Sequence, residues 1–281
     1  MRKGKFKVSR GIRQIALSTG IIFVLTLTAF LAPLVASHDP YQIDLSYEGR
    51  LRAPSVEHLF GTDHLGRDVF SRTLYGARIS LSVGLVAVFI MLLVGVSLGA
   101  VSGYYGGWID AVIMRLTEVA LSFPTIFLIM MILAFVGPNI VNVMVIIGLT
   151  SWPQTARLTR AEALTLKERD FMTASMVLGA SDARLIVRHL LPNAMAPIMV
   201  NAVFSVAGAI LTESALSFLG LGVQIPMPSW GNILMDGKNY MDTAWWIMLF
   251  PGLFIFISVL SYNMLADGLR NIFDPRMKAG A

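Results

Sequence analysis

Long runs without a charged residue alternate with polar segments along the chain, and this pattern predicts its architecture. A helix needs about 20 mainly apolar residues to cross a hydrocarbon core about 30 Å thick. Runs near that length predict six membrane-spanning helices, at residues 15–36, 79–102, 119–136, 140–156, 190–212 and 243–266. The third and fourth come from one uncharged run of 38 residues, which we expect to turn at 137–139, the tripeptide Gly-Pro-Asn.

One further uncharged run is not predicted to span. Residues 214–235 carry no charge over 22 residues, but glycine and proline recur through the segment. Irregular backbone cannot face lipid, because its N–H and C=O groups would lack hydrogen-bond partners. We therefore expect a structured loop here.

Composition places the chain in the membrane. Hydrophobic residues make up 56% of the 281 residues and charged residues 14%, and the mean hydropathy is +0.70. A soluble domain of this length could not bury so much apolar surface. The basic residues 1–14 before the first apolar run resemble a secretory signal, but that run of about 22 residues exceeds the roughly 7 to 15 of a signal sequence. We expect an uncleaved first span.

Basic residues set the expected orientation, since they are enriched on the cytoplasmic side. With six spans and both termini in the cytoplasm, 16 of the 22 Lys and Arg residues are cytoplasmic. This arrangement makes 1–14 a basic cytoplasmic N-terminus, 15–36 the first span, 37–78 an external loop and 79–281 a core of five spans. The net charge of +5 then fits contact with anionic lipid and requires no nucleic acid.

Small residues predict one helix contact in the second span. Gly95, Gly99 and Gly103 recur every four residues, which lets a neighbouring helix approach closely, although glycine is also common in membrane helices generally. We expect bends or breaks in the third, fifth and sixth spans at Pro124, Pro197 and Pro251.

Several chemistries are disfavoured. No charged residue falls in the middle of a predicted span, which argues against coupling to an ion gradient. The chain has no GxxxxGK[ST] nucleotide loop, so an ATPase would have to be another chain. The sequence contains no nucleophile elbow and no triad-like grouping, so an enzyme is also disfavoured. His58 and His64 share a loop with two aspartates, Asp63 and Asp68, but we favour ordinary loop hydrogen bonds there and predict no metal.

The segment DFMTASMVLGASDARLIVRHLLP, residues 170–192, is too polar to cross a bilayer and falls on the cytoplasmic side. Asp170 is a suitable N-cap for a short helix 171–178, and Gly179 suits the position that ends it, with positive φ. Ser181 can cap a second short helix that ends near Leu191, and Pro192 then marks the start of the fifth span.

The first of these helices presents apolar side chains on nearly all sides: Phe171, Met172, Met176, Val177 and Leu178. One side can rest on the spans while the other stays exposed, and exposed apolar patches are usually contact sites. A helix lying on lipid is the alternative, but it would carry Lys and Arg on its polar face. This helix has Thr173, Ala174 and Ser175 there, so we favour a protein partner.

This segment resembles the coupling-helix signature of ABC importer permeases: Glu-Ala-Ala, three residues, Gly, nine residues, then Ile-x-Leu-Pro. In this chain the pattern falls on 173–175, Gly179, His189, Leu191 and Pro192, with Thr in place of Glu and His in place of Ile. Four longer stretches, 58–81, 121–129, 213–234 and 261–276, resemble the second permease subunit of dipeptide, oligopeptide and nickel importers.

The resemblance implies a type I ABC importer permease fold, all-α, in the inner membrane. It implies a homologous permease, two ATP-binding subunits and an external solute-binding protein as partners, with ATP and Mg²⁺ on the ATPases and no cofactor on this chain. The residues implied in ATPase coupling lie within about 171–182: Phe171, Met172, Thr173, Ala174, Ser175, Leu178, Gly179, Ala180 and Asp182.

The implied solute is a di- or oligopeptide, with nickel as the alternative and an oligosaccharide as a more distant one. Two hypotheses from other classes stay open. A channel would conduct without nucleotide, and a membrane-bound structural partner would show no solute flux. Identifying the binding protein that docks on the complex, and its ligands, would separate the substrates.

Overall fold

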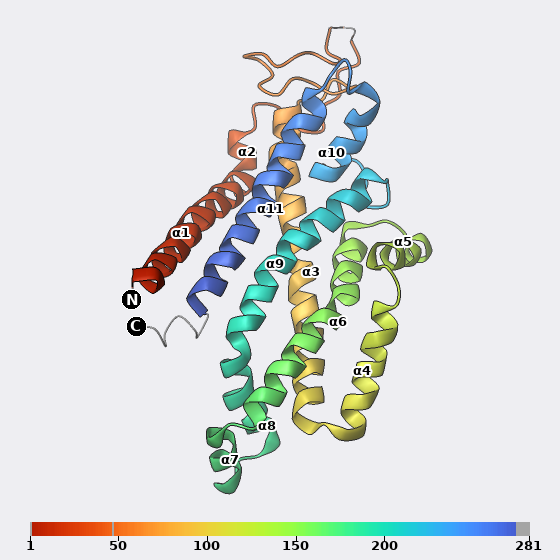
Figure 1. The fold of residues 1–281 in the computed structure, drawn as a ribbon. Helices are drawn as coiled ribbons and strands as arrows, with labels where there is room; N and C mark the ends of the chain where they lie inside the picture. Colours follow the sequence, from red (N-terminus) through yellow and green to blue (C-terminus); the bar gives the residue numbers. More distant parts are fainter. Residues whose placement is uncertain (1, 47, 274–281) are drawn as a thin grey trace.

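The computed structural model describes residues 2–46 and 48–273, with side chains from residue 11 onward, and within this part the chain is all-helical with no strand (Figure 1). The longer helices are α1 (Arg2–Phe30), α3 (Val69–Tyr105), α4 (Gly107–Leu121), α5 (Thr125–Val136), α6 (Ile140–Lys167), α9 (Leu191–Phe218) and α11 (Trp246–Phe273). The short ones are α2 (Ala32–Val35), α7 (Asp170–Val177), α8 (Asp182–Arg184), the π-helix η1 (Leu185–Leu190), α10 (Trp230–Gly237) and the 3₁₀ helix η2 (Lys238–Tyr240).

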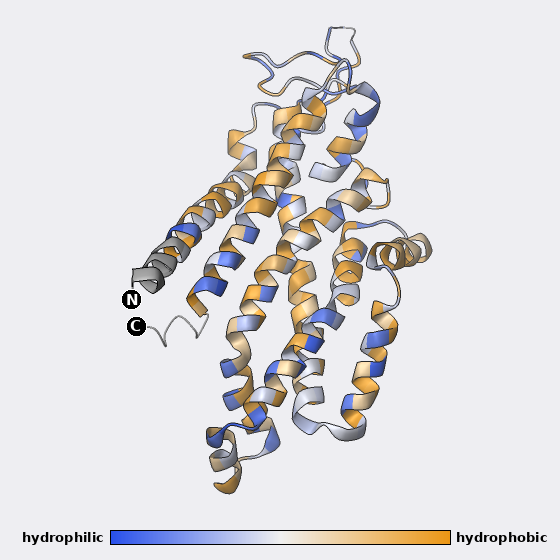
Figure 2. Cartoon of the chain, viewed as in Figure 1, coloured by the Kyte–Doolittle hydropathy of each residue, from blue (hydrophilic) through white to orange (hydrophobic). Residues whose placement is uncertain are grey.

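The long helices form one elongated bundle around α3 (Figure 1). Helices α6 and α9 pack against α3, and α1 packs along α11 at the side of the bundle. The segment 37–68 and α10 lie at one end, while α7 and α8 lie at the other (Figure 1). Apolar residues cover α5 and much of α1, whereas polar residues gather toward the ends (Figure 2).

Within the described residues, four helices are long and apolar enough to cross a membrane: Gly11–Phe30, Val69–Tyr105, Asp182–Phe218 and Trp246–Phe273. They correspond to the first, second, fifth and sixth predicted spans. The third prediction falls on the end of α4 and on α5, which meet this test only as a pair and are bent by 85° at the break between them. The fourth prediction falls on α6, which does not meet the test, so the described helices give four spans, or five with the bent pair. The expected turn at 137–139 is confirmed, since α5 ends at Val136 and α6 begins at Ile140.

Two predicted boundaries were wrong. Residues 69–78 are not loop but the first turns of α3, because the Asp68 side chain caps that helix by accepting the Ser71 N–H at 2.7 Å. The predicted loop 214–235 is irregular only over 219–229, since α9 continues to Phe218 and α10 begins at Trp230. A capping box between Ser229 and Asn232 starts α10.

The extension of α9 adds an ionisable side chain that the prediction of uncharged spans did not include. Glu213 lies in α9 and is fully buried. Its carboxylate accepts hydrogen bonds from the hydroxyls of Ser80 at 2.9 Å and Ser217 at 2.7 Å. The Ser80 bond joins α9 to α3, whereas the Ser217 bond lies within α9, and both compensate for the removal of the carboxylate from water.

The predicted glycine face is confirmed as the contact between α3 and α6. A Cβ added at Gly95 would lie 2.8 Å from Thr155 Cβ, one at Gly99 would lie 2.5 Å from the Ala156 carbonyl oxygen, and one at Gly103 would lie 2.6 Å from Ala163 Cβ. Only glycine allows backbones this close, so the three residues form a glycine seam.

The prolines act differently from one another. Pro124 lies at the break between α4 and α5, as predicted. Pro197 and Pro251, by contrast, lie inside α9 and α11, which continue through them without interruption. Neighbouring helices can accommodate the lost hydrogen bond inside a bundle.

Candidate functional site

The segment expected to contact a partner lies at the end of the bundle opposite segment 37–68 (Figure 1). Helix α6 leads into it and ends at Lys167, and α7 follows after two residues. Arg169, not Asp170, is the N-cap of α7, so Asp170 occupies the first helical turn. A carboxylate there still interacts favourably with the helix dipole, although the predicted capping role was wrong.

Gly179 ends α7 with a φ of +81°, which confirms the positive φ expected from the sequence. The N–H of Gly179 donates to the Met176 carbonyl at 2.9 Å, and the N–H of Ala180 donates to the Ser175 carbonyl at 3.1 Å. This pair of bonds is a Schellman motif, which satisfies the last carbonyls of the helix. A Cβ added at Gly179 would meet no atom within 4 Å, so backbone conformation alone selects glycine here.

The second short helix is not a separate element. Ser181 is its N-cap, as predicted, but α8 continues through the π-helix η1 into α9, so the helical run extends from Asp182 to Phe218. Pro192 lies within this continuous run, just after the π-helix, and it does not separate two helices.

One buried side chain of α7 and two contacts of the residues that flank it fix this segment to the bundle. Met172 is fully buried in a cluster with Ala100 and Tyr104 of α3 and with Leu185 and Leu190 of η1. The Tyr104 hydroxyl donates a 2.7 Å hydrogen bond to Asp182, just after the Gly179 turn. Lys167 donates to the Tyr104 carbonyl at 2.7 Å, with its ammonium 5.5 Å from the Tyr104 ring.

The opposite side of α7 is uncovered. Val177 and Leu178 are 82% and 87% exposed, whereas Phe171 is 39% exposed. The sequence-predicted coupling residues divide accordingly. Six are exposed, namely Phe171, Thr173, Ala174, Leu178, Gly179 and Asp182; Ser175 and Ala180 are half-buried, and Met172 faces the bundle. Val177 was not among them, although its place in the final turn beside Leu178 could have indicated it.

A second feature, which the sequence did not predict, is a cavity of about 390 Å³ between α3, α6 and α9. Polar groups from α6 and α9 face it, including Thr150, Ser151, Gln154, Asn201 and Thr212. Apolar groups of α3 and α9 complete the wall, among them Met91 and Phe204. Among the described residues that line this cavity none is charged and none is histidine.

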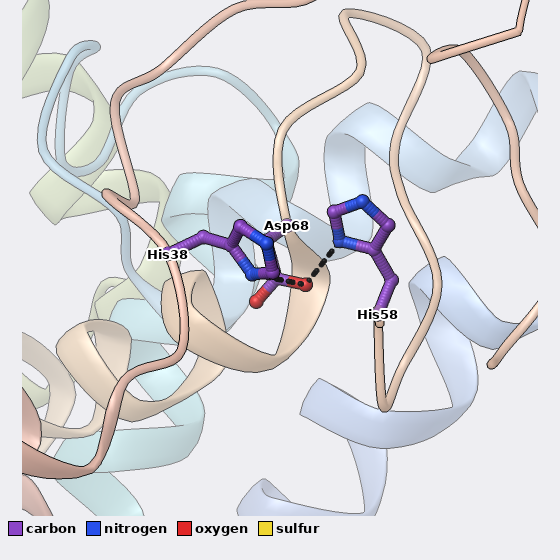
Figure 3. Close-up of side chains that lie close together, drawn as sticks. All are labelled: His38, His58 and Asp68. Atoms are coloured by element: carbon purple, nitrogen blue, oxygen red, sulfur yellow. Dashed lines mark hydrogen bonds and ion pairs between the residues drawn. The ribbon is translucent and has the colours of Figure 1, made fainter. Parts of the chain in front are cut away.

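The loop histidines do not group as the sequence suggested. His58 and Asp68 do meet, but their third neighbour is His38 (Figure 3). His64 instead stacks on Tyr240, with ring centroids 5.5 Å apart. Asp63 pairs with Arg67 at 2.7 Å. Neither His64 nor Asp63 therefore belongs to the group of His38, His58 and Asp68.

Comparison with known proteins adds to this geometry. Residues 95–279 match the family model described as binding-protein-dependent transport system inner membrane component. The dipeptide transport system permease protein DppC of Alkalihalophilus pseudofirmus is 44% identical over 259 residues, which cover 92% of this chain and 84% of that protein. The di/tripeptide transport system permease protein DppC of Pseudomonas aeruginosa is 42% identical over 268 residues, covering 93% and 88%.

A solved structure shares the fold. A chain of the MetNI methionine ABC transporter, in an inward-facing conformation, aligns with a TM-score of 0.56 at 19% identity, covering 75% of this chain and 96% of that one. At this identity the likeness concerns the arrangement of the helices alone.

Proposed function

Since the chain belongs to the family of binding-protein-dependent transport system inner membrane components, the permeases of ABC importers, we propose that it forms half of a translocation path for di- and oligopeptides. Permeases of this family are multi-pass membrane proteins and are not themselves catalytic.

We place α7 and the Gly179 turn in a cleft of an ATP-binding subunit. The support is the exposure of Val177 and Leu178 on a helix whose other side is fixed to α3 and η1. Exposed apolar side chains on a rigid support are typical of protein contacts. ATP and Mg²⁺ bind to that partner and supply the hydrolysis, while this chain transmits movement.

The proposed topology keeps six spans and cytoplasmic ends. The start of α1 and the end of α11 lie together, with Asn271 donating to Gln14 at 3.4 Å, which supports one side for both. Residue 1 and residues 274–281 lie outside the described part. Segment 37–68 and the turns around α10 then face the external solute-binding protein, and a homologous permease faces the cavity.

The lining of the cavity is the observation that supports a peptide. Hydroxyl and amide side chains such as Thr150, Gln154 and Asn201 can donate and accept hydrogen bonds, as peptide groups require. A path without fixed charge also accepts peptides whose side chains differ in charge. Nickel is disfavoured, because the described lining offers no imidazole or carboxylate ligand.

The deciding experiment reconstitutes this chain with its second permease, its two ATPase chains and the binding protein in vesicles. We expect uptake of labelled di- and tripeptides that requires ATP and the binding protein, and no uptake of a nickel chelate. Peptide flux without nucleotide would instead indicate a channel. ATP hydrolysis by this chain alone would contradict the assignment.

A further inference from the structure

Three potential metal ligands, His38, His58 and Asp68, lie close together (Figure 3). They belong to segment 37–68, at the end of the bundle opposite α7 (Figure 1). His38 follows α2, His58 comes from segment 37–68, and Asp68 immediately precedes α3. The group therefore joins three parts of the chain that are separated by 20 and 10 residues in sequence.

The distances suit one small ion. Asp68 Oδ1 lies 2.9 Å from His58 Nδ1 and 3.8 Å from His38 Nδ1, and the ligand atoms of all three residues lie within 4.8 Å of one another. Zinc binds nitrogen and oxygen ligands at about 2.0–2.2 Å, so two ligand atoms in a tetrahedral site lie about 3.3–3.6 Å apart. The observed distances lie on either side of that range.

Contacts within the protein hold these side chains in place without an ion. The Asp68 side chain is 1% exposed, and its Oδ2 accepts the Ser71 N–H at 2.7 Å. The His38 backbone N–H donates to the Ser71 hydroxyl at 3.1 Å, which fixes the backbone that carries this imidazole. The two imidazole rings stack with centroids 4.5 Å apart. Supporting contacts of this kind orient metal ligands and raise affinity.

The surroundings favour a cation. A cavity of about 180 Å³ adjoins the three residues and is also lined by Asp39, Asp44 and Glu57. The Ser46 N–H, 2.9 Å from Asp44, lowers the pKa of that carboxyl, so Asp44 is anionic at neutral pH. Arg52 is the one Lys or Arg in the described lining, and it pairs with Glu57 at 3.2 Å. The cavity has room for water to complete the coordination.

We propose that His38, His58 and Asp68 bind a divalent transition-metal ion of the zinc type as a resident structural ion. Two imidazoles and one carboxylate suit Zn²⁺ and its neighbours, whereas Ca²⁺ and Mg²⁺ require oxygen ligands. The ion fastens the start of segment 37–68 and the His58 turn to the N-terminus of α3. It lies outside the solute path, so it is neither cargo nor a participant in transport chemistry.

Zn²⁺ binding to the chelator-treated complex, measured by competition with a chromophoric chelator, tests the proposal. We expect one additional Zn²⁺ per copy of this chain compared with the double variant His38→Gln, His58→Gln. Each single variant should weaken that binding at least tenfold. His64→Gln and His189→Gln are matched controls that leave it unchanged, because neither belongs to the group.

A gain-of-signal variant keeps the test decisive if removal of a histidine disturbs the loop. The chain contains no cysteine, so His38→Cys introduces a single thiol at the site. Co²⁺ added to this variant should produce a thiolate-to-cobalt charge-transfer band that Zn²⁺ removes, and His64→Cys should produce none. Equal Zn²⁺ binding by wild type and the folded double variant, or no cobalt band from a folded His38→Cys chain, would overturn the proposal.

Discussion

The hydroxyl of Tyr104, in the last turn of α3, donates a 2.7 Å hydrogen bond to the carboxylate of Asp182, the first residue of α8. This bond connects the segment that we place in the ATPase directly to the helix at the centre of the bundle. A hydrogen bond to a charged group contributes about 1.5–3 kcal/mol.

Tyr104→Phe removes that bond and keeps the ring packed on Met172. We expect the ATPase chains to co-purify as before, while peptide uptake per ATP hydrolysed falls, because movement of α7 reaches α3 less directly. The measurement is the ratio of uptake to hydrolysis in vesicles. Tyr105→Phe is the control, since Tyr105 is 46% exposed. An unchanged ratio in Tyr104→Phe would show that the bond does not transmit movement.

Gly179→Val places a β-branched residue at a φ of +81°, which costs roughly 1–2 kcal/mol. The spans should insert normally, but the turn should distort, and ATPase recovery and peptide-stimulated hydrolysis should both fall. Gly137→Val is the matched control, because Gly137 has a φ of +92° and equally open surroundings beyond the other end of α6. Gly237 would be a poor control, since its added Cβ would lie 2.7 Å from Met248. Equal loss in both variants would point to a general folding defect.

Leu178→Ser tests the apolar contact itself. Because Leu178 is 87% exposed, the fold of this chain should not change, and a weaker ATPase association would reflect lost burial of about 1.5–3 kcal/mol. Phe171→Ala should act in the same direction but less strongly, since Phe171 is already partly covered by its own chain. Val56→Ser, at a 98% exposed position of the outer segment, should leave co-purification of the ATPases unchanged.

Single cysteines test the orientation in intact cells. Ser46, Asn239 and Thr165 are all exposed in the structure, so each introduced thiol can react. An impermeant thiol reagent should label Ser46→Cys and Asn239→Cys from outside and should not label Thr165→Cys. Labelling of Thr165→Cys alone would show that the chain has the opposite orientation.

Gly99→Leu should separate α3 from α6, because even a Cβ at this position would lie 2.5 Å from the Ala156 carbonyl oxygen. Gly99→Ala should cost about 1–3 kcal/mol through overpacking. Gly20→Ala in α1, where an added Cβ meets nothing within 4 Å, should be neutral or slightly stabilising. Thermal unfolding of the purified complex gives the comparison. A Gly99→Leu complex as stable as wild type would show that the seam is not a tight contact.

Periodicity and glycine spacing predicted the elements that depend on local physics. Backbone sterics explain the turn at 137–139, the glycine seam and the positive φ of Gly179. Glycine and proline positions can be read directly from the sequence. The end of α9 was harder to predict, because a charge count places Glu213 outside a span. Only the serines that α3 and the final turns of α9 bring together make a buried carboxylate acceptable there.

The functional features also differ in how far the sequence could predict them. The exposed side of α7 could be predicted because its apolar residues exceed what one packed side can use. The meeting of His38 with Asp68 could not, since 30 residues of irregular chain separate them. The cavity also depends on which sides of α3, α6 and α9 face each other, and that is set by packing between helices.

The glycine seam also bears on how a small tilt of α6 would displace the end of that helix. Helix α6 has 28 residues and is therefore about 42 Å long, and the seam holds its backbone directly against that of α3. A tilt of about 5° over that length displaces the far end by about 4 Å, since displacement is the product of length and angle. On the other side of α7, the chain continues into α9 through the π-helix η1, a conformation often found at functional positions. In the coupling that we propose, the α6 wall and the α9 wall of the cavity are thus connected to α7 by two different routes.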